Sequence, residues 1–194
     1  QEDSPSVAQS GDDKYDPFIQ LDKQIPVLSD LYTAIKSRHE KCQEMLLSLM
    51  STLYRVADMN PDAAIAAIHL SKQQSPLKQP IYGAILAHLF SEQHGLDEKK
   101  EHALVQAVLT CNLTFYEFQV LLNSMDGKLT DAQRTKMQKH PLQAAQFMET
   151  AGFIDPQLTK AIRQHHERPD GSGYPNHLKG PDISDLALVV SMCE

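Results

Sequence analysis

The sequence predicts an all-α fold, a bundle of short helices preceded by a long N-terminal helical segment. No stretch alternates apolar and polar residues with period two for long enough to predict a strand. Side chains that cap helices, and prolines that begin them, recur throughout the chain instead. Hydrophobic residues make up 41% of the chain, which has no tryptophan and only 6% aromatic residues. This composition favours aliphatic packing between helices.

The N-terminal part divides into a tail and the helical segment. Residues 1–16 are rich in Ser, Asp, Gln and Gly, and we expect a mobile tail because they have little to bury. Residues 17–60 form the N-terminal helical segment, and the stretch from Ser29 to Asp58 contains no Pro or Gly. A mostly apolar stripe with 3-4 spacing predicts a seam that packs either on the chain's own domain or, as a homodimer, on a second chain. The stripe consists of Leu28, Leu31, Ile35, Arg38, Cys42, Met45, Leu49, Thr52 and Val56.

Residues 61–194 are predicted to form a domain of short helices. Each helix start has a residue whose side chain can cap free backbone amides, or a proline at the first position. Gly95 is expected to end one of the helices. The predicted starts are Asn60-Pro61, Pro80, Asp97, Thr114 with Glu117 as a capping box, Thr130 with Gln133 as a second capping box, and Asp155-Pro156.

Charge and cysteine content limit the class of protein. A net charge of -7 argues against binding to a nucleic-acid polymer or a membrane surface, because both call for clustered Lys and Arg. Three widely spaced cysteines do not suggest a disulfide framework, which favours a reducing cytoplasm. No apolar run approaches the ~20 residues that cross a bilayer, and no signal peptide is visible. The chain opens at Gln1 and stops within an apolar pattern at Glu194, so we expect a piece of a longer protein, truncated at its C-terminus.

The most distinctive stretch runs from His165 to Pro175. It combines two adjacent histidines, three charged residues, two glycines and two prolines. The preceding residues predict a short helix that ends at the histidines, and the glycines and prolines that follow must turn the chain. Two imidazoles at the mouth of a stiff loop suit metal or phosphate chemistry. The alternative is a surface turn that happens to hold two histidines.

The stretch reads HHExxDGxGYP and resembles the signature of the HD-GYP family. These proteins are a branch of the HD superfamily of metal-dependent phosphohydrolases, and they hydrolyse cyclic di-GMP in bacterial signalling. The similarity covers roughly residues 75–194 and implies an HD-domain-like helical bundle. It includes Gly127-Lys128-Leu129-Thr130 and Lys139-His140-Pro141 upstream, and Leu178-Lys179-Gly180-Pro181-Asp182-Ile183 downstream.

The resemblance implies a cluster of metal ligands that this chain keeps only in part. His140, His165 and His166 match family histidines, and Glu194 stands where the family has its last carboxylate, normally Asp. The other positions are degenerate. The family's early Glu and His fall near Ser75 and Gln79, its His-Asp pair becomes Thr110-Cys111, and its phosphate-binding lysine becomes Thr114 or a neighbour. Two adjacent divalent ions repel strongly and need a bridging anion, so we expect no binuclear centre.

We therefore expect no cofactor, and two alternatives stay open. Cys111 with His140, His165 and His166 would suit a single zinc ion, whereas iron or manganese would require that a family-like site persists. Without a metal, Cys111 is a small buried apolar residue and the histidines hydrogen-bond to each other and to carboxylates.

The predicted function is that of a catalytically inactive or impaired HD-GYP signalling or scaffold domain in the bacterial cytoplasm. The resemblance implies a protein partner, such as a diguanylate-cyclase-type domain, that contacts the loop. One alternative is a metal-dependent cyclic di-GMP phosphodiesterase with a residual metal site. Another is a non-hydrolysing effector that binds the cyclic dinucleotide with Arg163, Arg168 and Lys179. The predicted loop residues are Glu167, Arg168, Asp170, Gly171, Gly173, Tyr174 and Pro175.

Overall fold

Helices account for all the regular structure in the part of the chain that the computed structural model describes, residues 16–70, 75–125 and 127–194. The all-α prediction is therefore confirmed, whereas the predicted tail lies outside the described residues except for Asp16. The helices are α1 (Pro17–Asp22), α2 (Gln24–Lys36), α3 (Cys42–Met59), α4 (Pro61–Leu70), α5 (Lys78–His94), α6 (Glu98–Thr110), α7 (Tyr116–Asn123), α8 (Asp131–Thr150), α9 (Pro156–Gln164) and α10 (Asp185–Cys193), with a short 3-10 turn, η1 (Gly180–Asp182).

Most of the predicted helix starts are confirmed by side-chain caps. Asn60 accepts a hydrogen bond from the amide of Ala63, Asp97 caps α6, and Thr130 with Gln133 forms the predicted capping box. The capping box at Thr114 is wrong, because α7 begins at Tyr116 without a side-chain cap. The Thr114 hydroxyl donates instead to the carbonyl of His140, at 3.3 Å.

The N-terminal segment is not one long helix. It breaks between α2 and α3, where Arg38 takes up the left-handed conformation with φ of 56°. Six of the nine residues of the predicted stripe are nevertheless buried within the chain, because Leu28, Leu31 and Ile35 on α2 and Cys42, Leu49 and Val56 on α3 are at most 2% exposed. Met45 and Thr52 are half-buried, and Arg38 is exposed. The two helices pack against each other and against α5. The stripe therefore covers the chain's own domain, and the homodimer stays a prediction.

Tyr32 joins the N-terminal helices to the end of α6. Its buried hydroxyl on α2 donates to the carbonyl of Leu109, at 2.7 Å. The last carbonyls of a helix have no partner inside the helix. In α6, each of these carbonyls accepts a hydrogen bond from a residue outside the helix. The amide and thiol of Cys111 donate to Ala107 and Val108, and the amide of Leu113 donates to Thr110.

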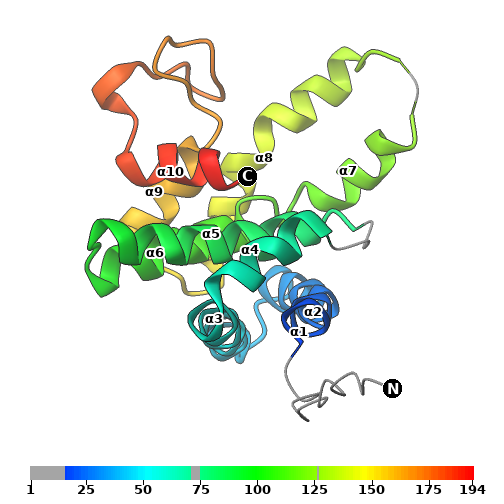
Figure 1. Cartoon of the computed structure of the whole chain (residues 1–194). Helices are drawn as coiled ribbons and strands as arrows, with labels where there is room; N and C mark the ends of the chain where they lie inside the picture. Colours follow the sequence, from blue (N-terminus) through cyan, green and yellow to red (C-terminus); the bar gives the residue numbers. More distant parts are fainter. Residues whose placement is uncertain (1–15, 71–74, 126) are drawn as a thin grey trace, which may run out of the picture.

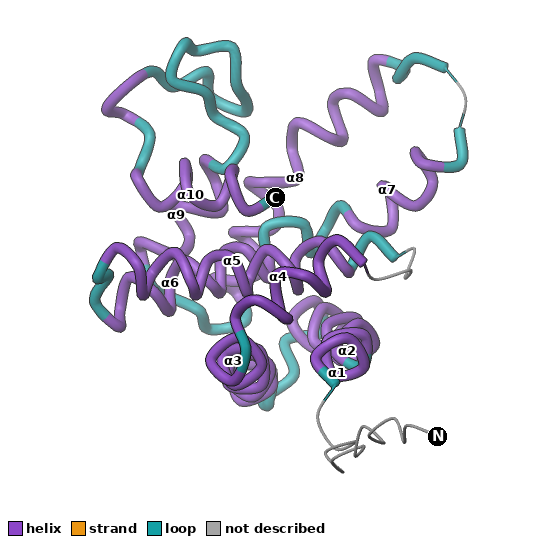
Figure 2. The backbone as a smooth tube through the Cα atoms, viewed as in Figure 1, coloured by secondary structure: helices purple, strands orange, loops and turns teal. Residues whose placement is uncertain are grey.

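The arrangement leaves the C-terminal end of α10 between two projecting parts. Helices α5 and α6 lie at the centre and contact α3, α9 and α10. In Figure 1, α7 and the first half of α8 extend from the body on one side, and the long loop between α9 and α10 extends on the other. Figure 2 shows that this second part is mostly loop. Residue Glu194 thus lies over the centre of the fold.

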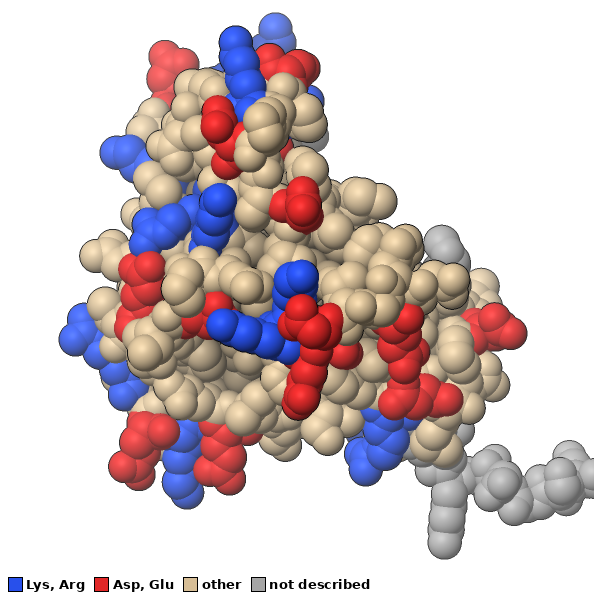
Figure 3. Space-filling model, turned by 90° about the vertical axis from the view of Figure 1, so that its left-hand side faces the viewer, with Lys and Arg blue, Asp and Glu red and all other residues tan. Residues whose placement is uncertain are grey.

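The length and hydropathy of the described helices bear on a bilayer crossing, and one face of the surface shows how the charges are distributed. No helix in the described ranges combines the length and the hydropathy that a bilayer crossing needs. Figure 3 shows acidic and basic side chains interspersed over one face of the molecule.

Candidate metal site and its loop

The five predicted ligand residues meet in one cluster. His140 comes from α8, His165 and His166 follow α9, Cys111 follows α6, and Glu194 follows α10. The potential ligand atoms form two groups, His140 with His165 and His166, and Cys111 with His165 and Glu194, each within 4.8 Å. A carboxylate oxygen of Glu194 lies 3.6 Å from Nε2 of His165 and 3.8 Å from Nε2 of His166. Residues far apart in the sequence thus surround one small space.

Two of the imidazoles are held in a fixed tautomer. Nδ1 of His140 lies 2.6 Å from the carbonyl of Met137, and Nδ1 of His165 lies 2.7 Å from the carbonyl of Ile162. A carbonyl can only accept, so both Nδ1 atoms carry the proton. Neither carbonyl accepts the i+4 hydrogen bond from a backbone amide of its own helix. Pro141 has no amide to donate to Met137, and Ile162 lies in the last turn of α9.

The consequence is that two bare acceptors face each other. With Nδ1 protonated, Nε2 of neutral His140 and Nε2 of neutral His165 each present a lone pair, and these atoms are 3.2 Å apart. The expected hydrogen bond between the histidines therefore needs one ring to be positively charged. Burial opposes that charge and lowers the pKa of both rings to about 4. A cation between the rings would satisfy both lone pairs, which is how histidine ligands are oriented in metal sites.

Burial disfavours the charged form of the other groups in the cluster as well. Burial lowers the pKa of His166 to about 2. Burial also raises the pKa of the Cys111 thiol well above its usual value, and the nearby Glu194 carboxylate adds to this effect. The pKa of Glu194 is raised by burial, although the hydrogen bond from Asn112 opposes the shift. In the metal-free chain Cys111 is therefore a protonated thiol, as expected for a small buried residue.

We predict that the metal-free chain loses stability as the pH falls below about 6.5. The pKa values of His140, His165 and His166 in the folded chain lie below the unfolded value, so the unfolded state binds more protons in this range. Each histidine should reduce the free energy of unfolding by up to about 1.4 kcal/mol per pH unit. Thermal unfolding of chelator-treated protein between about pH 7 and pH 5 measures this slope. His166→Gln should reduce the slope and the exposed control His39→Gln should not, whereas equal stability at both ends of the range would contradict the prediction.

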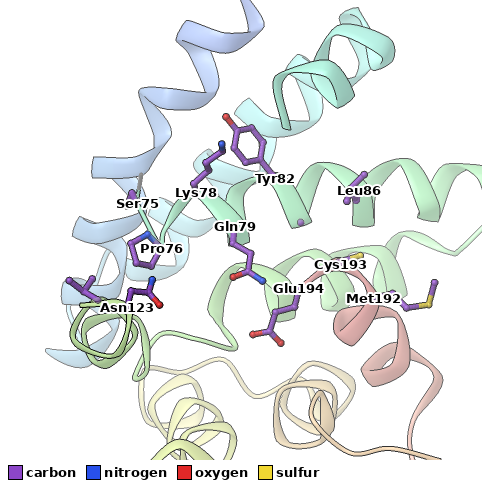
Figure 4. A pocket seen from close by; sticks show the side chains of 12 residues that line it. Ser75, Pro76, Lys78, Gln79, Tyr82, Leu86, Asn123, Met192, Cys193 and Glu194 are labelled. Atoms are coloured by element: carbon purple, nitrogen blue, oxygen red, sulfur yellow. The ribbon is translucent and has the colours of Figure 1, made fainter. Parts of the chain in front are cut away.

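The end of α6 supplies no second set of ligands. The hydroxyl of Thr110 donates to the carbonyl of Gln106 at 2.6 Å, and the side chain of Asn112 donates to Glu194. Ser75 and Gln79 line a cavity of about 730 Å³ together with Glu194. Figure 4 shows the side chains of Gln79 and Glu194 pointing into the same space. Among the described residues, Glu194 is the one carboxylate grouped with these histidines, so the residues fit a single ion but not a binuclear centre.

Sequence reasoning missed two residues of the site. Asn112 holds Glu194 through its amide, and the ring of Phe115 stacks on His140 with centroids 4.7 Å apart. A polar side chain directly after the Thr110-Cys111 pair was the available signal for Asn112. Phe115 gave no signal, because the capping box expected at Thr114 placed it inside a helix.

The loop after the histidines is held from within by Glu167. This residue is only 2% exposed, and its two carboxylate oxygens accept from the amides of Asn176 at 2.6 Å and Leu178 at 3.0 Å. Gly173 is buried against the backbone of residues 166–168, and the ring of Tyr174 lies 4.6 Å from that of His166.

The predicted loop residues therefore divide into two kinds. Glu167 and Gly173 are buried and shape the loop. Gly171, Tyr174 and Pro175 are half-buried, and Arg168 and Asp170 are exposed. The exposed residues, together with Lys179, are the ones that a partner can reach.

Comparison with known proteins gives the same family as the motif. A family model described as an HD domain matches residues 25–190. The cyclic di-GMP phosphodiesterase response regulator RpfG of Xanthomonas campestris is 31% identical over 111 residues, which are 56% of this chain and 29% of the relative. A cyclic di-GMP phosphodiesterase of Pseudomonas aeruginosa is 34% identical over 68 residues, 35% of this chain and 16% of the relative. The chain thus spans less than a third of the length of these relatives.

A solved structure shares the fold. The HDG"Y"P protein Bd1817 of Bdellovibrio bacteriovorus superposes with a TM-score of 0.73 at 18% sequence identity, over 95% of this chain and 61% of that chain. At this identity the likeness concerns the fold alone. Because the HD-domain match takes in most of the chain, and because the chain itself carries the HHExxDGxGYP motif, the chain belongs to the HD domain family, within its HD-GYP branch.

Proposed function

We propose that this domain acts in cyclic di-GMP-related bacterial signalling without hydrolysing the dinucleotide through a binuclear centre, and that it presents the loop after α9 to a protein partner. The observation that carries the proposal is the end of α6, where Thr110 and Cys111 stand in place of the family's His-Asp pair. The Thr110 hydroxyl is committed to the carbonyl of Gln106, and the Cys111 thiol is buried.

Charge balance explains why this substitution matters. Two divalent ions about 3.5–4 Å apart require an anion between them. Glu194 is one carboxylate and already accepts a hydrogen bond from Asn112. With no second carboxylate grouped with the histidines in the described residues, the activated bridging water of the family reaction has no site.

The shape of the loop after α9 supports the proposal that it binds a protein partner. Both oxygens of Glu167 and the backbone bonds from Tyr174 to His166 and from Gly180 to Pro169 hold it in one shape. A partner would therefore meet a surface that needs little ordering, which lowers the entropic cost of association. Arg168 and Lys179 are exposed on it, and the family resemblance suggests a diguanylate-cyclase-type domain as the partner.

An activity assay tests whether the chain hydrolyses cyclic di-GMP. The purified chain is incubated with cyclic di-GMP and added Mn²⁺ or Fe²⁺, beside the Pseudomonas aeruginosa phosphodiesterase as positive control. We expect turnover in the control and none in this chain. Turnover that is lost in His166→Ala would overturn the proposal. Thermal stabilisation by the dinucleotide without turnover would point to the non-hydrolysing effector.

A binding assay tests whether the loop after α9 contacts a protein partner. Arg168→Ala should weaken binding to a diguanylate-cyclase domain by about tenfold, the cost of one or two lost charge-assisted contacts. Arg55→Ala, which removes the same charge from α3, should leave binding unchanged. Equal affinities for both variants would separate the loop from partner binding.

A second candidate function is a single-metal phosphodiesterase, favoured by the facing Nε2 atoms of His140 and His165. His140, His165, His166 and Glu194 would hold the ion, which would supply Lewis acidity. In the metal-free cluster, the carbonyls of Met137 and Ile162 keep the two imidazoles oriented. Elemental analysis of protein purified without chelator would then give about one ion per chain more in the wild type than in His166→Gln. Equal metal contents in the two proteins would end this candidate.

A further inference from the structure

A second histidine cluster lies away from the site described above. His88 on α5 is 5% exposed, and both of its ring nitrogens contact carboxylates. Nδ1 lies 2.6 Å from Glu101 on α6, and Nε2 lies 2.8 Å from Asp58 on α3. Glu92 follows His88 by one helical turn, and its carboxylate, the Asp58 carboxylate and a ring nitrogen of His88 lie within 4.8 Å of one another.

The charges around His88 do not balance among the described residues. Three carboxylates surround one imidazole, and no lysine or arginine forms an ion pair with any of them in the described ranges. The Glu92 side chain has no hydrogen bond or ion pair to another described residue. Asp58 lies in the last turn of α3, where the helix dipole disfavours negative charge. A bound cation would offset all of these charges.

Glu101 fixes the orientation of the His88 ring. A carboxylate can only accept, so Nδ1 donates its proton to Glu101. A histidine that donates one ring nitrogen to a carboxylate and turns the other toward a metal is a recurring arrangement in zinc sites. The other nitrogen, Nε2, lies 2.8 Å from Asp58 and donates to this carboxylate in the metal-free chain, so a metal ion would bind here by displacing the Nε2 proton. Asp58 also lines an open cavity of about 570 Å³.

We propose that Asp58, His88 and Glu92 form a site for one divalent metal ion, with Glu101 as the partner that orients His88. Imidazole nitrogens and carboxylate oxygens are both ligands of zinc, and water can take the remaining position. The ion joins the end of α3 to α5, and so it ties the N-terminal helices to the core. The site shares no residue with the His140 cluster.

The competing arrangement is a positively charged His88 that bridges Asp58 and Glu101 without a metal. Although burial lowers its pKa, the hydrogen bonds to Asp58 and Glu101 raise the pKa of His88 overall. This arrangement uses the same three residues but leaves Glu92 without a role. The decisive residue is therefore Glu92, which only the metal site requires.

Zinc titration of the full chain by calorimetry tests the proposal. The double variant Asp58→Asn with Glu92→Gln should bind about one equivalent of Zn²⁺ fewer than the wild type. Glu101→Gln should retain the site but weaken it by about 10- to 100-fold. The control pair Asp30→Asn with Glu40→Gln changes the charge by the same amount at exposed positions, and it should bind zinc as the wild type does.

Two further readouts assign the ion to its site. His166→Gln should leave the zinc bound by Asp58, His88 and Glu92 in place, even if it removes an ion from the His140 cluster. Cobalt bound in place of zinc should show no thiolate-to-metal charge transfer, because the site has no cysteine. The proposal is overturned if the double variant binds as much zinc as the wild type, or if His166→Gln removes all bound zinc. Because Asp58 and Glu92 are exposed, both substitutions should leave the fold intact, and circular dichroism verifies this.

Discussion

Glu167→Gln should destabilise the domain by about 3–5 kcal/mol. One carboxylate oxygen becomes an amide NH₂ that faces a backbone N–H of Asn176 or Leu178, so a charge-assisted hydrogen bond is lost and a buried donor is left without an acceptor. For a chain of this size the melting temperature should fall by roughly 10 °C. Thermal unfolding followed by circular dichroism measures the loss, and hydrogen exchange of residues 174–180 locates it.

The matched control for this change is Glu40→Gln. Glu40 is an exposed glutamate in the turn between α2 and α3, and the same substitution there should change the free energy of unfolding by no more than about 0.5 kcal/mol. If Glu167→Gln melts within about 2 °C of the wild type, then the carboxylate does not hold the loop.

Gly173→Ala should displace the loop from the histidines. A Cβ at this position would meet the backbone of Arg168, the Cα of Glu167 and, at 2.5 Å, the carbonyl oxygen of His166. None of these atoms belongs to a side chain that can move away, so the loop itself must shift, at a cost of about 3 kcal/mol or more. We expect a lower melting temperature and altered NMR signals of the His166 ring.

Gly180→Ala separates this steric effect from the loss of backbone freedom. Gly180 lies in the same loop with φ of +47°, and a Cβ there meets no atom within 4 Å. Its substitution should cost only about 1–2 kcal/mol, the penalty of the left-handed conformation. If both variants lose the same stability, close packing of Gly173 is not what positions the loop.

The sequence predicts those site residues that lie in the HHExxDGxGYP motif or at positions that match the family. His140, His165, His166 and Glu194 could be grouped from sequence, and their side chains do come together. The function of Glu167 could not be read in this way, because its partners are backbone amides whose positions depend on how the loop folds back. The facing lone pairs of His140 and His165 depend on which carbonyls remain free, which requires the packed structure.

Two expectations about local structure failed for a common reason. The break at Arg38 contains no Pro or Gly, and apolar residues continue with helical spacing on both sides of it. Thr114 has the sequence pattern of a capping box, but its hydroxyl bonds to the His140 carbonyl on a different helix. The break lets α2 and α3 pack against each other, and Thr114 contacts α8. In both places tertiary contacts outweigh local preference, and such contacts are not visible in a single sequence.

The bond from Tyr32 to the Leu109 carbonyl has a practical consequence for anyone who wishes to work with a smaller piece of this protein. A fragment cut at the start of α4 would strip a buried acceptor of its hydroxyl donor, and unpaired acceptors of this kind are costly. It would also expose the aliphatic surface now covered by Leu31, Ile35 and Leu49. Helices α1 to α3 are therefore inseparable from the part that carries the histidines, and truncation studies should start upstream of residue 17.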